Sequence, residues 1–572
     1  MQRQAPVPPS DEIDLYIRTY YSLLRSSGDV RVRAFEESHA FSESTLHPGA
    51  LAPSPDASAF AYAAARLPRE MLATELIVLG QSHELFEANG LGVREWAPVR
   101  TRGRRRPLRH DAASKTLAVF IASESDIDDL VPIVTAYQME WNKLHERLKT
   151  AIVDGAELPD DRTLGEILGI TIPNVDVLRA AFTAADFERG MRAVAREPID
   201  LKMRLLSASF SQYQRAAQRW WSGIEPTYLR VEKPRRPPVY FVSSNTHAVA
   251  NLLGGYAKTH ITGIEAYAKR RNPEGLYPVV EEALKSGKLE EVLPLAYYLL
   301  RGYIHDSADT SRMREVRAFE ASIGLTHLSE PGHIDIDAQI IELSKLNPAL
   351  LDPRLELDGI DLLKASEAVI LNIDYPLGMA AYHILSRLGQ GVGELRGVYV
   401  MGKAATLNGR VGDVSLISVV YDEHSRNTFL FRNGFTAKDV SPYLRYGSVF
   451  DNQSAVTVRS AFLQNKHYMN AFYREGYTVL EMEAGPFMSA AYELVHPTRI
   501  PQDEIVNLTS RAGFDVGVVH YASDTPYSRR QSLLSKSLSY FGVDATYACA
   551  IAIVRRIFER EVALLRAEKA AG

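Results

Sequence analysis

The chain has 572 residues, with 65 Lys and Arg against 70 Asp and Glu, which gives a formal net charge of −5. This length exceeds one ordinary domain, and 46% hydrophobic with 24% charged residues is typical of a globular protein rather than a disordered one. The slightly acidic balance argues against nucleic acid as the main partner. The single cysteine excludes a disulfide framework within the chain, a cysteine-based zinc site and an iron–sulfur cluster.

No apolar run reaches the ~18–20 residues that a membrane-spanning helix needs, and the N-terminus lacks the apolar segment of a secretory signal. We therefore expect a soluble, cytoplasmic protein with no membrane partner. No histidine spacing matches a metal-binding motif, so we predict no metal and no bound cofactor.

The first part of the chain predicts more helix than strand. Residues 1–10 contain three prolines and predict a flexible tail, and Asp11–Leu24 spaces its apolar residues as a helix does. A short buried strand is predicted at Leu117–Ile121 and a long helix at Ser125–Leu148. We take residues 11–230 as a mainly helical α/β N-terminal region.

The densest charge run of the chain is Arg100–Asp111. It lacks the interleaved aromatic residues on which nucleic-acid bases stack. This pattern favours a solvated loop, or one that pairs with acids of a neighbouring subunit, over a nucleic-acid site.

Pro234–Pro238 (PRRPP) separates the N-terminal region from a middle one. Val239–Ala257 predicts a strand, a Ser-Ser-Asn turn and a helix ended by two glycines, and Pro278–Asp306 predicts two further helices. The turn is either an anion site at a helix N-terminus or the cap of a core helix. We take residues 231–350 as an α/β or helical middle region, followed by a proline-containing linker at Ser344–Asp358.

From about Gly359 the pattern changes to strands alternating with helices. The predicted strands are Ala368–Ile373, Gly397–Met401, Val414–Tyr421, Thr478–Met482 and Val516–Ala522, and the predicted helices are Gly378–Leu388, Pro486–Leu494 and about Asp544–Ala567. This alternation implies a mixed or parallel sheet covered by helices on both faces, in which ligands bind beyond the carboxyl ends of the strands.

Three polar clusters follow apolar strands in this part of the chain. In the first, Gly402–Asp413 (GKAATLNGRVGD), glycine and small residues let backbone N–H groups approach an anion or a sugar. In the second, TVLEMEAGP, the strand period points Glu481 and Glu483 to the same side, where they would suit the hydroxyls of a sugar. The alternative interpretations are a plain glycine turn for the first cluster and solvated acids at an exposed strand end for the second.

The third cluster is Val518–Pro526 (VVHYASDTP), in which Asp524 follows a strand too apolar to be exposed. A carboxylate in such a place has a raised pKa and acts as a proton donor. A turn aspartate before Pro526 is the alternative.

Together these clusters resemble the nucleoside phosphorylase/nucleosidase superfamily, an α/β fold that cleaves N-glycosidic bonds. Its G-x-x-G-x-L loop with a following GD is similar to GKAATLNGRVGD, with Ala405 in place of the second glycine. Its (E/D)ME(A/S/G) and S-D motifs are similar to EMEA and YASD. Within the superfamily, the AMP nucleosidase branch is the most similar, on Asp422–His424 (DEH), SDTP and Ile370–Tyr382. The resemblance covers about Ala368–Arg566.

The resemblance implies a mixed-sheet, three-layer catalytic domain at residues 359–572 that cleaves a purine nucleoside or nucleotide. It implies that Glu483 holds the ribose hydroxyls, that Asp524 is the acid at the base and that Phe462 stacks on the base. The other substrate-binding residues that it implies are Gly402, Lys403, Ala404, Thr406, His424, Glu481, Met482 and Ser523.

The attacking nucleophile is either water or inorganic phosphate. Hexameric phosphorylases of this family have a phosphate-gripping arginine where this chain has Gly378, and a second one in an R-x-G that is Val400–Gly402 here. Lys403 is a candidate replacement charge. We favour water, with phosphate as the alternative co-substrate, and Asp374 as the base that activates the water; a turn aspartate before Pro376 is the alternative role for it.

The resemblance also implies a homo-oligomer whose subunits complete each other's sites, with Tyr421–Phe431 as the candidate contribution. The alternative function is a non-catalytic nucleotide-binding sensor or scaffold, because residues 1–358 resemble no family that we recognise.

Overall fold

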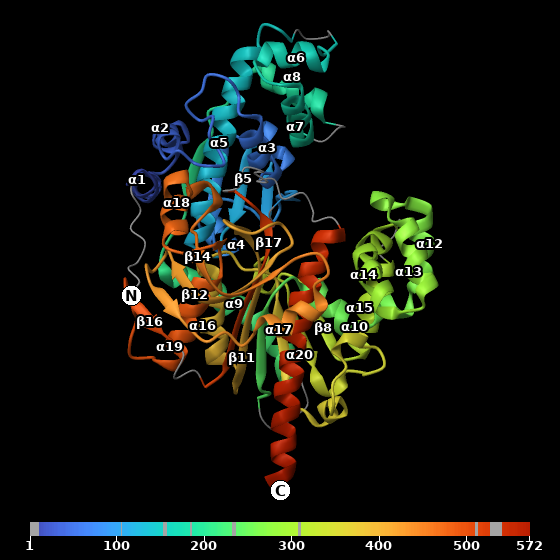
Figure 1. Ribbon diagram of the computed structural model, residues 1–572. Helices are drawn as coiled ribbons and strands as arrows, with labels where there is room; N and C mark the ends of the chain where they lie inside the picture. Colours follow the sequence, from blue (N-terminus) through green and yellow to red (C-terminus); the bar gives the residue numbers. More distant parts are fainter. Residues whose placement is uncertain are drawn as a thin grey trace.

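The computed structural model describes residues 11–103, 106–152, 157–182, 186–230, 236–306, 311–508, 513–526 and 540–571. The predicted tail, residues 1–10, and two arginines of the basic run, Arg104 and Arg105, lie outside the described residues. The described part has a mixed α/β fold with two sheets (Figure 1).

The first sheet lies in the N-terminal region. Its strands are β1 (Val30–Arg31), β2 (Leu76–Gly80), β3 (Ala97–Val99), β4 (Leu108–Asp111), β5 (Thr116–Phe120) and β6 (Lys202–Leu205). The helices of the region are α1 (Glu12–Ser26), α2 (Arg33–Phe41), α3 (Ala57–Arg66), α4 (His83–Ala88), α5 (Glu124–Leu148), α6 (Asp161–Leu168), α7 (Ile172–Phe182), α8 (Phe187–Arg196) and α9 (Phe210–Leu229). The strand order is β1-β6-β2-β5-β4-β3, with β2 parallel to both of its neighbours.

The second sheet uses the rest of the chain. Its strands are β7 (Val239–Ser243), β8 (Leu325–Leu328), β9 (Ala338–Glu342), β10 (Val369–Ile373), β11 (Leu395–Thr406), β12 (Val414–Asp422), β13 (Thr428–Leu430), β14 (Val449–Thr457), β15 (Val479–Glu481), β16 (Ile505–Asn507) and β17 (Asp515–Asp524). The helices are α10 (Thr246–Gly254), α11 (Tyr256–Thr259), α12 (Ile261–Arg271), α13 (Tyr277–Ser286), α14 (Leu289–His305), α15 (Ser311–Ser322), α16 (Met379–Gly391), α17 (Ala437–Val440), α18 (Lys466–Arg474), α19 (Ala484–Val495) and α20 (Tyr540–Ala571).

Five strands of the second sheet close into a ring of pairings. β11 pairs with β17, β17 with β12, β12 with β14, β14 with β15, and β15 again with β11. From β11 the sheet continues outward through β7, β10, β9 and β8.

Along the chain, residue 231, the first predicted division, lies between the two sheets, whereas residue 359, the second, lies within the second sheet. Strand β7 lies between β10 and β11, parallel to both, and β8 and β9 extend the same edge. The predicted linker Ser344–Asp358 therefore connects two adjacent strands of one sheet. The helical pattern of the middle region concealed this arrangement, because helices α10–α15 fill the chain between β7 and β8.

Helices cover both faces of the second sheet, as predicted. Strand β7 shows why, because its side chains alternate between two cores. Val239 and Phe241 pack with residues of α9, α16 and α19, whereas Tyr240 and Val242 pack with residues of α10, α14 and α20. Within the described ranges, no helix is both long and apolar enough to cross a membrane.

The glycine-containing cluster after β11 differs from its predicted form. The strand passes Met401, where it was predicted to end, and pairs with β17 as far as Ala405, which lies opposite Asp524. Gly402, Lys403 and Ala404 are therefore strand residues and not part of a loop. The continued pairing satisfies their backbone hydrogen-bonding groups.

A buried ion pair joins the N-terminal region to the second sheet. Arg459, which follows β14, donates from Nε to Asp128 Oδ2 of α5 at 2.9 Å, and the Tyr20 hydroxyl donates to Asp128 Oδ1 at 2.5 Å. Asp128 is fully buried, so its charge depends on these two partners. The contact holds the N-terminal region against the residues that follow the strands of the second sheet.

We expect Asp128→Ala to lower the free energy of unfolding by about 3–5 kcal/mol, because the substitution leaves the Arg459 guanidinium at the interface without its carboxylate. Chemical unfolding of the full chain measures the loss. Asp200→Ala is the control, because it breaks an exposed pair with Arg31 and should cost about 0–1 kcal/mol. Equal losses in the two variants would contradict a special role for the buried pair.

Candidate functional site

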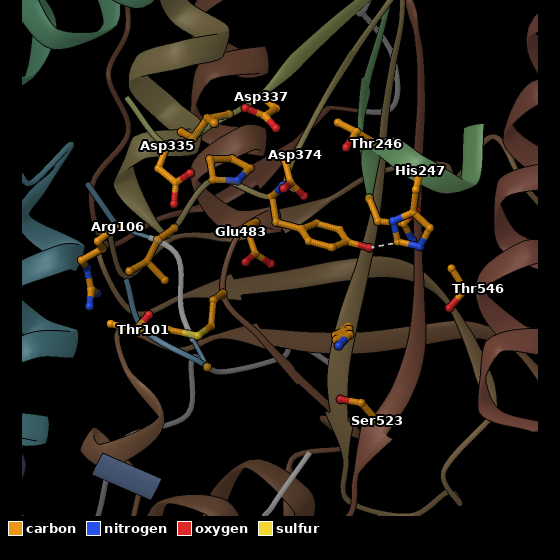
Figure 2. Close-up of a pocket in the computed structure, with 18 of the residues that line it drawn as sticks. Thr101, Arg106, Thr246, His247, Asp335, Asp337, Asp374, Glu483, Ser523 and Thr546 are labelled. Carbon is orange, nitrogen blue, oxygen red and sulfur yellow. Dashed lines mark hydrogen bonds between the residues drawn. The ribbon is translucent and has the colours of Figure 1, made fainter. Parts of the chain in front are cut away.

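A cavity of about 1380 Å³ lies between the N-terminal region and the second sheet, and Figure 2 shows part of its lining. Its walls come from α3 and the basic run, from α10, α14 and α15, and from the ends of β10, β11, β15 and β17. The sequence-predicted site residues that line it are Asp374, Lys403, Ala404, Glu481, Met482, Glu483, Ser523 and Asp524.

Strand β11 brings the second and third clusters together. Ala405 lies opposite Leu480 of β15 on one side and opposite Asp524 of β17 on the other. On β17 the register shifts between Ala522 and Asp524, so Ser523 is the extra residue of a bulge. Bulges redirect side chains at the ends of strands, and this one places both Ser523 and Asp524 on the cavity wall.

The surroundings of Asp524 favour the protonated form of its carboxyl. Its Oδ2 accepts a hydrogen bond from Ser523 Oγ at 2.8 Å, whereas its buried Oδ1 has no partner among the described residues. Burial raises the pKa of the Asp524 carboxyl above its usual value, and the Ser523 hydrogen bond and the positive charges of Lys403 and Arg66 oppose this rise. A protonated carboxyl here has a proton to donate into the cavity.

Glu483 precedes the first residue of α19 and lines the cavity, where Figure 2 labels it. A Cβ atom added at Gly402 would lie 3.7 Å from Glu483 Oε2 and 3.0 Å from His520 Nδ1. The glycine thus leaves room for the carboxylate and for a buried imidazole, while Gly402 itself does not line the cavity.

Glu481 has a different role from Glu483, although the strand period predicted that they share one side. Strand β15 ends at Glu481 and a helix begins after Glu483, so the period of two does not extend to the second glutamate. Glu481 Oε2 accepts hydrogen bonds from the backbone N–H groups of Glu483 and Ala484 at 2.7 Å each, and Oε1 accepts one from the Thr457 hydroxyl. Glu481 is 2% exposed and holds the N-terminus of α19 in place.

The structure does not bring Phe462, Thr406 or His424 to the cavity wall. The Phe462 ring is 1% exposed and packs against Tyr62 in the core, where it has no access to a base. Thr406 Oγ1 accepts a hydrogen bond from Gly409 N at 2.9 Å in the turn after β11.

His424 is buried at the interface with the N-terminal region. Its Nδ1 lies 2.8 Å from Asp422 Oδ1, and its Nε2 lies 3.1 Å from Ser125 Oγ of the same chain. This part of Tyr421–Phe431, predicted to complete a neighbouring subunit's site, contacts its own chain here.

Asp374 directly follows β10 and lines the cavity, where its Oδ1 accepts a hydrogen bond from Tyr375 N at 3.0 Å. Two further aspartates, Asp335 and Asp337, line the cavity near it (Figure 2). No motif marks these two in the sequence, because each stands in an irregular segment between β8 and β9.

Residues of the first 360 positions form much of the cavity, and sequence reasoning missed most of them. Arg106 of the basic run is not solvated: its side chain is 5% exposed and pairs with Asp126 and Asp129 of α5. Thr246 and His247 follow the Ser-Ser-Asn turn and line the cavity (Figure 2), whereas Asn245 caps α10 by accepting from Ala248 N at 2.7 Å.

Across the part of the chain that the structure describes, no group of three or more His, Cys, Asp or Glu side chains is arranged to hold a metal ion. The side chains that line the cavity include carboxyl groups, hydroxyls, imidazoles and cations.

The chain belongs to a family of unknown function, DUF6909, whose model matches residues 32–559. A search of curated proteins finds no match to the chain.

Several solved structures of nucleoside-cleaving proteins are similar to part of the chain. A candidate methylthioadenosine nucleosidase from Weissella paramesenteroides is 13% identical, over 42% of this chain and 92% of its own, with a TM-score of 0.28. A methylthioadenosine phosphorylase from an antarctic soil metagenomic library is 11% identical, over 41% and 76%, with a TM-score of 0.25. Uridine phosphorylase from Schistosoma mansoni is 13% identical, over 33% and 71%, also with a TM-score of 0.25.

The Glu481 carboxyl gives a pH dependence that stability measurements test. Burial raises its pKa from about 4.5 to about 7, so its contribution to stability is complete below pH 4.5 and is lost as the pH rises through 7. Relative to Glu481→Gln, which does not titrate, the wild-type free energy of unfolding should fall by up to about 3 kcal/mol between pH 4.5 and 8. Glu475→Gln, at an exposed position, should track the wild type; a parallel profile for Glu481→Gln would contradict the raised pKa.

Proposed function

We propose that this member of the DUF6909 family cleaves the N-glycosidic bond of a purine nucleoside or nucleotide, with water as the attacking nucleophile. The observation that carries the proposal is Asp524, a carboxyl with a raised pKa and an unpartnered Oδ1 in the same cavity as Glu483. The order of the motifs, GKAAT, EMEA and YASD, agrees with the resemblance found in the sequence.

Asp524 acts on the leaving base. As the glycosidic bond lengthens, negative charge develops on the base and positive charge on the sugar. A proton donated by the Asp524 carboxyl neutralises the base, and such acid catalysis contributes about 10²–10⁴-fold to the rate. The Ser523 hydroxyl, which donates to Oδ2, orients the Asp524 carboxyl on the cavity wall.

Glu483 holds the sugar. Its carboxylate accepts hydrogen bonds from the vicinal ribose hydroxyls, and two such charge-assisted contacts fix the ring relative to Asp524. Glu481 supports this arrangement, because the hydrogen bond that its carboxylate accepts from the Glu483 N–H orients the start of α19.

The surroundings of Gly378 favour water over phosphate. The residue has φ +49°, and a Cβ atom there would lie 2.2 Å from Ser125 Oγ. Helix α5 of the N-terminal region thus fills the place where the resembling phosphorylases have a phosphate-gripping arginine. Asp374, on the cavity wall just before this position, is the proposed base that activates the water.

Base release from a panel of nucleosides and nucleotides, with and without inorganic phosphate, tests the proposal. Hydrolysis predicts release that does not depend on phosphate. Release only with phosphate would assign the enzyme to phosphorolysis, with Lys403 as the candidate anion ligand. Saturable binding without release would favour the nucleotide sensor and overturn the catalytic proposal.

Asp524→Asn should reduce base release by about 10²–10⁴-fold without unfolding the chain, because the amide has no proton of comparable acidity to donate. In the wild type, kcat/KM should fall as the pH rises through the raised pKa of Asp524, since the protonated form is the active one. Asp361→Asn, at an exposed carboxylate, is the control for substitution alone. Full activity of Asp524→Asn would remove this residue from the mechanism.

Glu483→Gln should lower kcat/KM for ribonucleosides by about 10- to 100-fold, the worth of a charge-assisted hydrogen bond to each hydroxyl. The loss should be much smaller for 2′-deoxyribonucleosides, which lack one of these hydroxyls. Steady-state kinetics with a matched ribo and 2′-deoxyribo pair measures the difference. An equal loss for both substrates would show that Glu483 does not bind the 2′-hydroxyl.

A further inference from the structure

Three side chains, Phe462, Tyr62 and Arg66, contact one another in a row that runs from a buried core to the cavity. The innermost is Phe462, which is 1% exposed. The Tyr62 ring of α3 meets it edge-on, with the ring centroids 5.3 Å apart and an interplanar angle of 82°. The Arg66 guanidinium lies over the Tyr62 ring, with Cζ 3.4 Å from the ring centroid. Tyr62 and Arg66 line the cavity, whereas Phe462 does not.

A hydrogen bond to its own helix and the packing of the basic run beside it position the Arg66 side chain. Its Nη1 donates to the Tyr62 carbonyl oxygen at 3.1 Å. The N–H groups of Arg102 and Gly103 both donate to the Ala65 carbonyl oxygen, which fixes the loop of the basic run against the end of α3. A Cβ atom at Gly103 would lie 3.2 Å from Arg66 Cγ, so the absence of a side chain there leaves room for the arginine stem.

Arg66 makes no ion pair with any carboxylate among the residues described here, and one face of its guanidinium is covered by Tyr62. The side chain also lines the cavity, where a ligand can reach it. Its charge is felt at Asp524, where it opposes the rise in pKa. Arg66 and Asp524 line the same cavity.

We propose that Arg66, stacked on Tyr62, is the platform on which the leaving base stacks. This inference rests on the proposed function and adds the residue that recognises the base. A guanidinium is planar and weakly hydrated, and it stacks on π-faces, including those of nucleobases, while remaining charged. The aromatic residue predicted to stack on the base, Phe462, lies in the layer behind Tyr62, so the N-terminal region supplies the outermost layer.

The platform also suits the proposed chemistry. The base departs with negative charge developing on it, and a cation against its face stabilises that charge while Asp524 delivers the proton at its edge. Stacking is tolerant of the identity of the base, because every base has a π-face. Edge contacts, such as that of Asp524, must then provide selectivity for a purine.

Binding of free adenine, and separately of inorganic phosphate, by titration calorimetry tests the platform, together with base release kinetics. Arg66→Lys keeps the charge and removes the planar group. We expect it to weaken adenine binding by about 5- to 100-fold, the range for one base stacked on one side chain, and to raise KM more than it lowers kcat.

Arg25→Lys is the matched control, because Arg25 also lies over a tyrosine ring, that of Tyr21, with Cζ 4.6 Å from the ring centroid, but away from the cavity. It should leave adenine binding and KM unchanged. Wild-type adenine affinity and KM in Arg66→Lys would overturn the platform. Loss of phosphate binding without loss of adenine binding in Arg66→Met would instead make Arg66 an anion ligand and would also overturn it.

The outcomes separate this inference from the proposed function. If the wild type releases base and Arg66→Lys does so with an unchanged KM, the platform fails while the proposed function stands. If the wild type binds adenine through Arg66 but releases no base from any substrate, the platform stands and the catalytic proposal fails.

Discussion

The position of β11 between β15 and β17 is the constraint on which the candidate site depends. Ala405 faces Leu480 on one neighbour and Asp524 on the other, so two segments about forty residues apart in sequence end beside one another. Because side chains alternate between the faces of a strand, a slip of one residue in either pairing would turn the acidic groups away from the cavity. The bulge at Ser523 provides the last adjustment, since it places adjacent polar residues on the same wall.

The two glutamates of the EMEA motif show how burial assigns different roles to identical side chains. Glu481 ends a strand inside the protein, and three hydrogen-bond donors satisfy its carboxylate. Glu483, two residues later, immediately precedes α19 and lines the cavity. An unsatisfied buried carboxylate is costly, which explains why the donors around Glu481 hold it in a structural role.

The N-terminal region contributes side chains to the wall of the candidate site. Its helix α5 fills the space beside Gly378 and carries Asp128, whose buried charge is balanced by Arg459 from beyond β14. Its helix α3 carries the Tyr62 and Arg66 stack. A buried ion pair that loses one partner is strongly destabilising, so this pair favours contact between the two regions.

The sequence by itself determined the α/β alternation after residue 359 and the three polar clusters, because apolar strands and their polar ends depend on local pattern. Asp524 and Glu483 followed from that pattern and the motif resemblance, and both line the cavity. Only the tertiary structure decided that β7 enters the second sheet, since strand pairing between distant segments leaves no local signal. The same reason applies to Phe462 and Arg66. The burial of the Phe462 ring behind Tyr62, and the position of Arg66 over Tyr62, depend on α3 packing against a segment almost four hundred residues away.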